Sequence, residues 1–372
     1  MQLSNEDNLR LNVLLAQDLK AVRIDESKMI VYALTSRGDA KIQLNPTGKD
    51  EKYIRLVKEL LSNKFMGSPG GYPVYIKRST RMGQERQQES LAQLLLLGEP
   101  EAVVAVVHAP NLTTDIARHA WWALPSSENA RRLLEKQSIA ESDLARELVE
   151  FLLEFLPFEI EHRDMIDSVR LCLQNNLLTA DEIDELWKRA RRKQSLYVGF
   201  LHSQPDALPD QVGAHPLYQQ LQQPLQSLVE QGNVYAIQLL RYLSEPGQGF
   251  LKTIIRVIEK AASQDTIVSL FQALSNYNRS LPLASVKQRD IKNAEQLVTV
   301  WMSGDQDEQL LSCLQVCTEY RDQIRAMLVI SQLDEVTLFP VFGLTDALGS
   351  VMRKKLQPVT GPLLQHIQQL LH

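Results

Sequence analysis

The chain has 372 residues, of which 44% are hydrophobic and 23% are charged, and its formal net charge is −5. This composition is typical of a folded globular protein and excludes a disordered chain. The mild acidic excess excludes a general electrostatic attraction to nucleic acids or anionic membranes, so any basic contact has to be local.

The amino-terminal region predicts a small α+β domain over residues 1–84. The run SNED at Ser4 has the spacing of a capping box, and apolar residues follow it at helical intervals. Residues 21–44 alternate between apolar and polar side chains, which predicts two or three strands. Residues 49–65 again show helical spacing, and the run YPVYIKR, which begins at Tyr72, predicts one more short strand.

The run GSPGG at residues 67–71 is the densest glycine stretch of the chain. Three cations follow it: Lys77, Arg78 and Arg81. A phosphate-binding loop would need Lys-Ser or Lys-Thr after its last glycine and a helix after that, and a nucleophile elbow would need a glycine two residues before Ser68. Neither pattern is present. We therefore expect a turn, in which Gly67 ends a helix and Gly70 adopts a positive φ.

The rest of the chain predicts consecutive helices with prolines at their joints. The run Asp-apolar-Ala-Arg occurs at Asp115 and again at Asp143, which favours a HEAT-like, α-solenoid-like helical-repeat body, although any stack of helices produces such similarities. Residues 195–215 are rich in Pro and Gly and predict a linker. The expected helical domains are therefore residues 85–204 and 215–372, and the fold class is mainly α.

Four runs within about residues 3–209 resemble the DsrS-type sulfur reduction proteins, which are encoded with the reverse dissimilatory sulfite reductase genes of sulfur-oxidising bacteria. These runs are GSPGGYPVYIKRSTRMGQ, LLLLGEPEAVVAVVHAP, ARHAWWALPSSENARRLL and LLEFLPFE. The resemblance implies an accessory or regulatory role that supports sulfur oxidation in the cytoplasm. It provides no catalytic residue to carry over to this chain.

Metal and thiol chemistry have weak sequence support. The chain has no HxxxH and no CxxC motif, so we expect no metal site and no cofactor. Its three cysteines and the absence of a signal-like amino terminus indicate a cytoplasmic protein, and no apolar run is long enough for a membrane helix. Cys313 and Cys317 share one helix face, which is compatible with sulfur handling, but their apolar neighbours favour core packing, and Cys172 is interpreted likewise.

The strongest basic cluster is the run WKRARRK, which begins at Trp187. Its five cations are Lys188, Arg189, Arg191, Arg192 and Lys193. Together with the flanking Trp187 and Tyr197, they suit single-stranded RNA, through phosphate contacts and base stacking. Acidic residues early in the same segment and basic residues late are, however, the ordinary charge pattern of a helix, which favours a solvated helix end.

These observations favour an interaction protein with no catalytic residues. We expect it to bind a protein partner through the surfaces of its helical repeats. An RNA-binding regulator that uses the two basic clusters is the alternative, and thiol-based sulfur handling by Cys313 and Cys317 is a second one.

Overall fold

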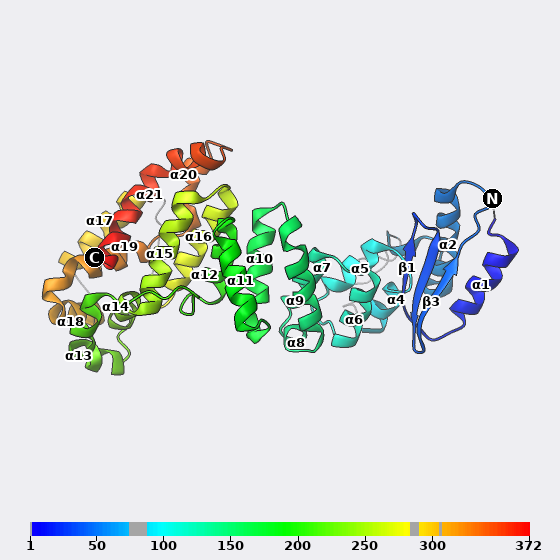
Figure 1. Ribbon diagram of the computed structural model, residues 1–372, viewed down its shortest axis with the longest axis horizontal. Helices are drawn as coiled ribbons and strands as arrows, with labels where there is room; N and C mark the ends of the chain where they lie inside the picture. The colour runs from blue at the N-terminus through cyan, green and yellow to red at the C-terminus, as the bar shows by residue number, and fades with distance from the viewer. Residues whose placement is uncertain (1, 74–87, 283–289, 305–306) are drawn as a thin grey trace. The chain divides into compact units, whose positions relative to one another are not determined.

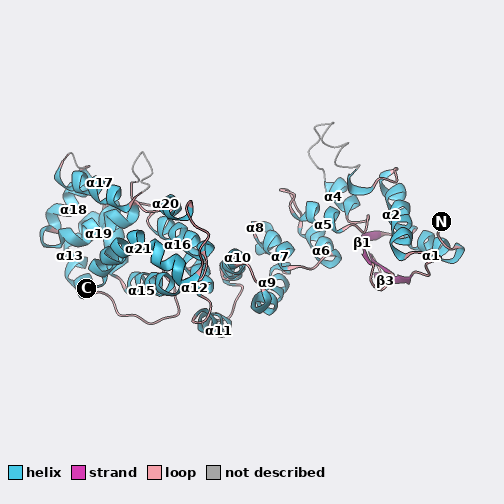
Figure 2. Ribbon diagram, turned by 90° about the horizontal axis from the view of Figure 1, so that it is seen from above, coloured by secondary structure: helices cyan, strands magenta, loops and turns pink. Residues whose placement is uncertain are grey.

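The computed structural model describes residues 2–73, 88–282, 290–304 and 307–372 of the chain. Most of these residues are helical, and a small antiparallel sheet lies near the amino terminus, which confirms the expected mainly α class (Figures 1 and 2). Contacts within the chain divide it into two compact units, Met1–Phe155 and Leu156–His372. The boundary between the two units falls at a point where the sequence predicts none.

The amino-terminal unit contains the whole described sheet. Its strands are β1 (Leu19–Asp25), β2 (Ile30–Thr35) and β3 (Gly38–Gln43). Its helices are α1 (Asn5–Leu15), α2 (Asp50–Met66), α4 (Gln88–Leu94), α5 (Pro100–Val107), α6 (Thr114–Ala123), α7 (Ser127–Leu134), α8 (Gln137–Ala140) and α9 (Leu144–Phe155). The strands pair antiparallel in the order β1-β2-β3, which confirms the strands that the alternating pattern over residues 21–44 predicts.

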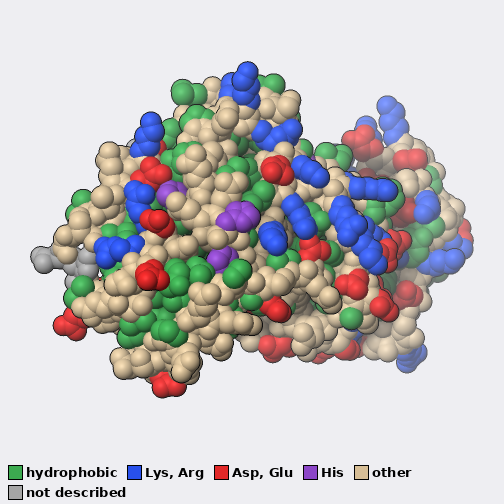
Figure 3. Space-filling view, turned by 60° about the vertical axis from the view of Figure 1, so that its left-hand side comes forward, with side chains coloured by type: hydrophobic (Ala, Val, Ile, Leu, Met, Phe, Trp, Pro, Cys, Tyr) green, Lys and Arg blue, Asp and Glu red, His purple; other side chains and the backbone are tan. Residues whose placement is uncertain are grey.

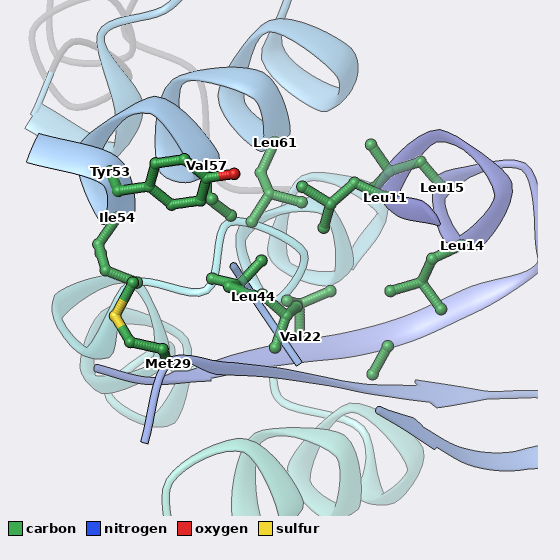
Figure 4. Packing of buried hydrophobic residues seen from close by; sticks show 12 residues of the cluster. Leu11, Leu14, Leu15, Val22, Met29, Leu44, Tyr53, Ile54, Val57 and Leu61 are labelled. Carbon is green, nitrogen blue, oxygen red and sulfur yellow. The ribbon is translucent and has the colours of Figure 1, made fainter. Parts of the chain in front are cut away.

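One hydrophobic core of the amino-terminal unit lies between the sheet and the helices α1 and α2. Figure 4 shows side chains from these elements pointing toward one another. The fully or almost fully buried members include Leu11, Val31, Tyr53, Val57 and Leu61. Because the strand and helix periodicities both direct apolar side chains to this layer, burial of these side chains stabilises both kinds of element at once.

A buried carboxylate joins α1 to the start of α2. Ser4 caps α1 by accepting a hydrogen bond from the Asp7 backbone N–H at 3.1 Å, which is one half of the predicted capping box. The Ser4 N–H donates to the Tyr53 hydroxyl at 3.0 Å instead of to Asp7. Asp7 itself is fully buried, and its Oδ2 accepts hydrogen bonds from the Tyr53 hydroxyl at 2.5 Å and from the Asn45 N–H at 2.8 Å. These bonds offset part of the cost of burying the carboxylate.

The glycine stretch is a turn, as expected, but its geometry differs from the prediction in one detail. Helix α2 ends where Gly67 adopts φ 66°, which confirms the predicted helix end. The next left-handed residue is Gly71, with φ 60°, one position after the one predicted. A Cβ atom on Gly71 would lie 2.3 Å from Glu99 Oε1, so close packing as well as backbone conformation requires glycine there.

The prediction of a strand that begins at Tyr72 is wrong for the first residues of that strand. Residues 71–73 are helical, and the rest of the predicted strand lies outside the described residues. Side chains hold this turn: the Gly71 N–H donates to Ser62 Oγ at 2.8 Å, and the Tyr72 N–H donates to Glu99 Oε2 at 2.9 Å. Side-chain acceptors for the first N–H groups of a helix are not visible in a local propensity pattern.

The described residues of the carboxy-terminal unit form helices joined by turns and loops, with no strand among them. Its longer helices are α10 (His162–Cys172), α11 (Ala180–Ala190), α12 (Gln194–Ser203), α13 (Pro216–Glu230), α14 (Val234–Leu243), α15 (Glu245–Lys260), α16 (Gln264–Tyr277), α17 (Ile291–Ser303), α18 (Glu308–Val316), α19 (Arg321–Ser331) and α21 (Gly349–Leu371). Short turns of helix lie at Leu156–Phe158, Gln174–Asn176, Thr318–Tyr320, Glu335–Leu338 and α20 (Phe339–Phe342). Within the described residues, no helix has both the length and the apolar stretch that crossing a membrane requires.

The prediction of a linker over residues 195–215 is wrong for its first half. Residues 194–203 form α12, and every side chain from Gln194 to Leu201 is buried. Helix α12 packs against α10, α11, α15 and α16. The run SLYVGFLH has apolar residues all around the helix, which is the pattern of a buried helix rather than of a linker. Its Gly199 allows close packing: a Cβ atom there would lie 2.6 Å from Val169 Cβ on α10.

We therefore expect Gly199→Val to lower the free energy of unfolding of the carboxy-terminal unit by about 3 kcal/mol, because α10 and α12 would have to separate. Gly213→Val is the matched control, because no heavy atom lies within 4 Å of a Cβ atom built there. Denaturant unfolding followed by circular dichroism measures both variants. Equal stability of the two variants would contradict the close packing of α12 on α10.

Candidate functional site

The five predicted cations lie at the end of α11 and in the turn that leads to α12. Helix α11 begins with a capping box, in which Thr179 and Glu182 each bind the backbone N–H of the other. Acidic residues occupy its first turn, and Lys188 and Arg189 occupy its last, as expected for a helix whose charges complement its dipole. The helix ends at Ala190, so the remaining three cations belong to the turn and the N-cap of α12.

Four of the five cations line one pocket of about 490 Å³. We call it the basic pocket, and its lining residues are Leu156, Pro157, Glu185, Lys188, Arg189, Arg192, Lys193 and Leu196. Figure 3 shows Lys and Arg side chains gathering on one face of the molecule. Leu156 and Leu196 are almost completely buried, so the pocket combines cations with an apolar base.

Most of the positive charge in the basic pocket has no internal counterion. Arg189 Nη2 forms an ion pair with Glu185 Oε1 at 2.5 Å, one helical turn earlier. Over the described ranges of the chain, Lys188, Arg192 and Lys193 form no ion pair and no side-chain hydrogen bond. The pocket therefore presents three uncompensated cations around an apolar surface, an arrangement that attracts anions.

Arg191 lines a second pocket rather than the basic pocket. It lines a smaller pocket of about 300 Å³ with Gln194, Tyr197, Asp210, Arg256 and Lys260. Asp210 accepts a hydrogen bond from Trp187 Nε1 at 2.8 Å and forms an ion pair with Arg256. Arg191 therefore lines a pocket in which a carboxylate neutralises part of the positive charge, and it does not line the basic pocket.

The two aromatic residues that flank the cations are not available to stack on bases. Trp187 and Tyr197 are each only 3% exposed. Their rings meet edge to face at 4.5 Å, and Trp187 also contacts Phe200 at 4.9 Å. The alternative in which they supply a stacking surface for RNA is therefore wrong, because both rings are part of the packing between α11 and α12.

The other predicted cluster, Lys77, Arg78 and Arg81, lies outside the described residues. Two apolar members of the basic pocket, Leu156 and Pro157, were not predicted from the sequence. They precede Lys188 by about thirty positions and carry no local motif, so only the tertiary structure brings them to it. Glu185 had a usable signal, since it stands four residues before Arg189 on the same helix.

The cysteines are free and buried. Burial raises the pKa of Cys172 to about 12. The hydrogen bond between Cys313 and Cys317, and burial, raise the pKa of Cys313, whereas the same bond lowers the pKa of Cys317. Both side chains of this pair are 0% exposed, so a thiolate on Cys317 has no direct contact with a dissolved reagent. A reactive cysteine needs access as well as a lowered pKa.

A chain of hydroxyl groups in the carboxy-terminal unit includes a histidine that the sequence did not single out. His162 Nδ1 lies 2.5 Å from Ser195 Oγ, which lies 3.2 Å from Thr266 Oγ1. A serine beside a histidine is the arrangement of a nucleophile and its base. Ser195 is only 1% exposed, however, so a substrate cannot reach its oxygen in this conformation, and the pair joins α10, α12 and α16.

No group of three or more His, Cys, Asp or Glu side chains suited to a metal ion occurs within the described ranges.

Asp210 should contribute a pH-dependent part of the stability. Burial raises its pKa, but the hydrogen bond from Trp187 and the ion pair with Arg256 outweigh burial and hold the pKa below its ordinary value. A lowered pKa in the folded state means that the stabilisation is present above the ordinary value and is lost as the pH falls through the folded value. We expect Asp210→Asn to cost about 1–2 kcal/mol at neutral pH, and we expect the difference from wild type to shrink in acid unfolding titrations. A constant difference at all pH values would contradict this role.

The buried cysteines should react with a soluble thiol reagent only when the protein opens. We expect the labelling rate of Cys313 and Cys317 in the native protein to equal the rate in the unfolded chain multiplied by about the fraction of molecules in the open state. Mass spectrometry after timed alkylation measures each site. Rapid, stoichiometric labelling or persulfidation of Cys317 in the native protein would favour thiol-based sulfur handling instead.

The basic pocket is thus described from the residues of this chain alone. The resemblance to the DsrS-type sulfur reduction proteins stays an expectation that rests on the runs quoted above. No protein-family model, no curated protein and no solved structure matches the chain.

Proposed function

We propose that this chain is a non-enzymatic accessory protein that binds an acidic segment of a protein partner in the basic pocket. The observation that carries the proposal is the set of three uncompensated cations, Lys188, Arg192 and Lys193, beside an apolar base. Carboxylates of a partner form charge-assisted hydrogen bonds with such cations. An apolar side chain of the same segment gains from contact with Leu156 and Pro157.

Two apolar residues that follow Pro157 in the chain are exposed. Phe158, which directly follows Pro157 in the chain, is 75% exposed, and Ile160 is 82% exposed. A large exposed aromatic side chain beside a charged surface is typical of protein–protein contacts, because it supplies apolar area at a low entropic cost. The pocket volume of about 490 Å³ is large enough to hold one or two side chains of a partner.

RNA is the less favoured ligand for three reasons. The aromatic rings beside the cations are buried, Arg191 lines a separate pocket, and the base of the pocket is apolar. Phosphate contacts alone give salt-dependent binding without base recognition. An RNA-binding regulator therefore stays the alternative that the experiment below has to separate from a protein-binding role.

The wider role follows from the expectations of the sequence. We propose that the helices stack as HEAT-like repeats, supported by the packing of α7 on α9 and of α10 on α12, and that the resemblance to the DsrS-type proteins assigns the partner to cytoplasmic sulfur oxidation. The absence of a catalytic role is part of the same proposal. It is supported by the burial of Ser195 and of the cysteines, which are the nucleophilic groups considered above.

The proposal is tested with the full chain as bait in an extract of cells grown on reduced sulfur, with and without nuclease. We expect a discrete set of acidic proteins to bind wild-type bait, to resist nuclease, and to be lost with the triple change Lys188→Glu, Arg192→Glu and Lys193→Glu. Purified partner then gives the affinity, and we expect a loss of about a hundredfold for the triple variant, because rim cations become repulsive.

The matched control is a triple change to Glu at three exposed cations of the same unit that do not line the basic pocket: Lys252, Arg279 and Lys292. Both variants alter the net charge equally, so only the location of the change differs. Equal loss of binding in both variants would indicate a general charge effect. Binding that disappears with nuclease and with salt would assign the pocket to RNA.

A further inference from the structure

The amino-terminal unit contains a separate pocket of about 510 Å³. It lies where strand β1, the start of α5 and the end of α6 meet, and its lining residues are Val22, Arg23, Ile24, Asp25, Glu26, Lys28, Tyr32, Gly98, Glu99, Pro100, Val103, Ala123, Leu124 and Pro125. More than half of these residues are apolar or glycine. A concave, largely apolar surface with a few charged groups is the usual composition of a site for a small ligand.

Arg23 is held in this pocket by two aromatic rings. Its guanidinium carbon lies 4.8 Å from the centre of the Tyr32 ring and 4.9 Å from the centre of the Trp122 ring. Tyr32 is the residue directly opposite Arg23 on β2, and Trp122 is provided by α6, which packs against β1. The guanidinium also donates a long hydrogen bond of 3.4 Å to the Trp122 carbonyl oxygen. Cation–π contacts on an arginine fix its orientation without neutralising its charge.

Two of the carboxylates that line the pocket have other partners. Asp25 accepts hydrogen bonds from Ser27 Oγ at 2.6 Å and from the Lys28 N–H at 3.1 Å, and its other oxygen lies 3.3 Å from Lys28 Nζ. Glu26 forms an ion pair with Lys58 at 2.7 Å. Each of these acids is therefore satisfied by its own neighbours rather than by Arg23.

The third carboxylate, Glu99, is used by the glycine turn. Its Oε2 accepts the Tyr72 N–H at 2.9 Å, and its side chain packs against Gly71. Over the described ranges of the chain, no carboxylate forms an ion pair with Arg23, although three line the same pocket. An oriented arginine without a counterion, at the edge of an apolar pocket, is suited to bind the carboxylate of a ligand.

We propose that this pocket binds a monocarboxylate attached to an apolar group, with Arg23 binding the carboxylate. The apolar group contacts Ile24, Leu124 and Pro125, which line the pocket and are partly or fully exposed. The lining holds three carboxylates and two cations, so a ligand with a second negative charge, such as a phosphate dianion, is repelled. A free aliphatic acid and the carboxy terminus of an apolar peptide share this chemistry.

The test uses hexanoate and its uncharged analogue hexanamide with the full chain, and the readout is the indole N–H signal of Trp122 in ¹⁵N NMR spectra. Loss of one signal in Trp122→Phe assigns it. We expect hexanoate to shift this signal saturably, with a Kd of about 1 mM or lower, and hexanamide to leave it unchanged at the same concentrations. This comparison uses the wild-type protein, so it does not depend on how a variant folds.

Arg23→Gln should weaken hexanoate binding at least about tenfold, because the charge-assisted bond is lost. Arg37→Gln, in the exposed turn between β2 and β3 of the same sheet, is the matched control and should bind as wild type does. Acetyl-Leu-Leu with a free or an amidated carboxy terminus distinguishes the source of the carboxylate. Preference for the free dipeptide over hexanoate assigns the pocket to peptide ends, and the reverse assigns it to small acids.

The proposal is overturned if neither acid binds, if acid and amide bind equally, or if Arg23→Gln binds as tightly as Arg37→Gln does. The triple variant of the basic pocket should still bind hexanoate, because its altered residues belong to the other unit. A loss of partner binding without a loss of hexanoate binding therefore tests the two proposals separately.

Discussion

The close contact between Gly199 of α12 and Val169 of α10 is the constraint on which the described carboxy-terminal unit depends. Only a residue without a Cβ atom allows the two helices to approach this closely. That approach accompanies the burial of α12 from Gln194 to Leu201 and its contacts with α10, α11, α15 and α16. Near the start of α12, Leu196 lines the basic pocket, and the Tyr197 ring packs against Trp187. The site is therefore a consequence of this packing.

The same packing decides what the basic cluster can bind. A straight helix that carried all five cations would distribute them around its axis, but α11 ends at Ala190 and the chain turns. The turn directs Arg192 and Lys193 toward Lys188 and Arg189, while Arg191 joins Asp210 and Arg256. Burial of Trp187 and Tyr197 stabilises this turn through ring contacts, and it removes the aromatic surface that single-stranded RNA requires.

The sequence predicted α1, the three strands and the end of α2, because local signals determine them: Ser4 caps α1, the strand residues alternate, and Gly67 ends α2. The strand that it predicted from Tyr72 is not formed at its start, where residues 71–73 are helical. The sequence did not predict α12, because a glycine occurs both in linkers and where two helices pack closely. Gly199 was interpreted as a sign of a linker, whereas its role is to let two helices pack closely. The cations of the site were predictable as a charged run, but Leu156 has no motif, and its approach to Lys188 depends on tertiary packing alone.

The two pockets present cations in different electrostatic surroundings, and this difference sets what each is proposed to recognise. The basic pocket has several solvated cations and one carboxylate, so its attraction is long-ranged, depends on salt and tolerates many arrangements of negative charge. The Arg23 pocket has a single oriented guanidinium among carboxylates that are already paired, so its field is short-ranged and favours one charge in one position. A long acidic segment therefore suits the first pocket, and a single carboxylate beside an apolar group suits the second. Because aromatic rings orient Arg23 before any ligand arrives, the second pocket loses little side-chain entropy on binding, which permits selectivity for a ligand much smaller than a protein.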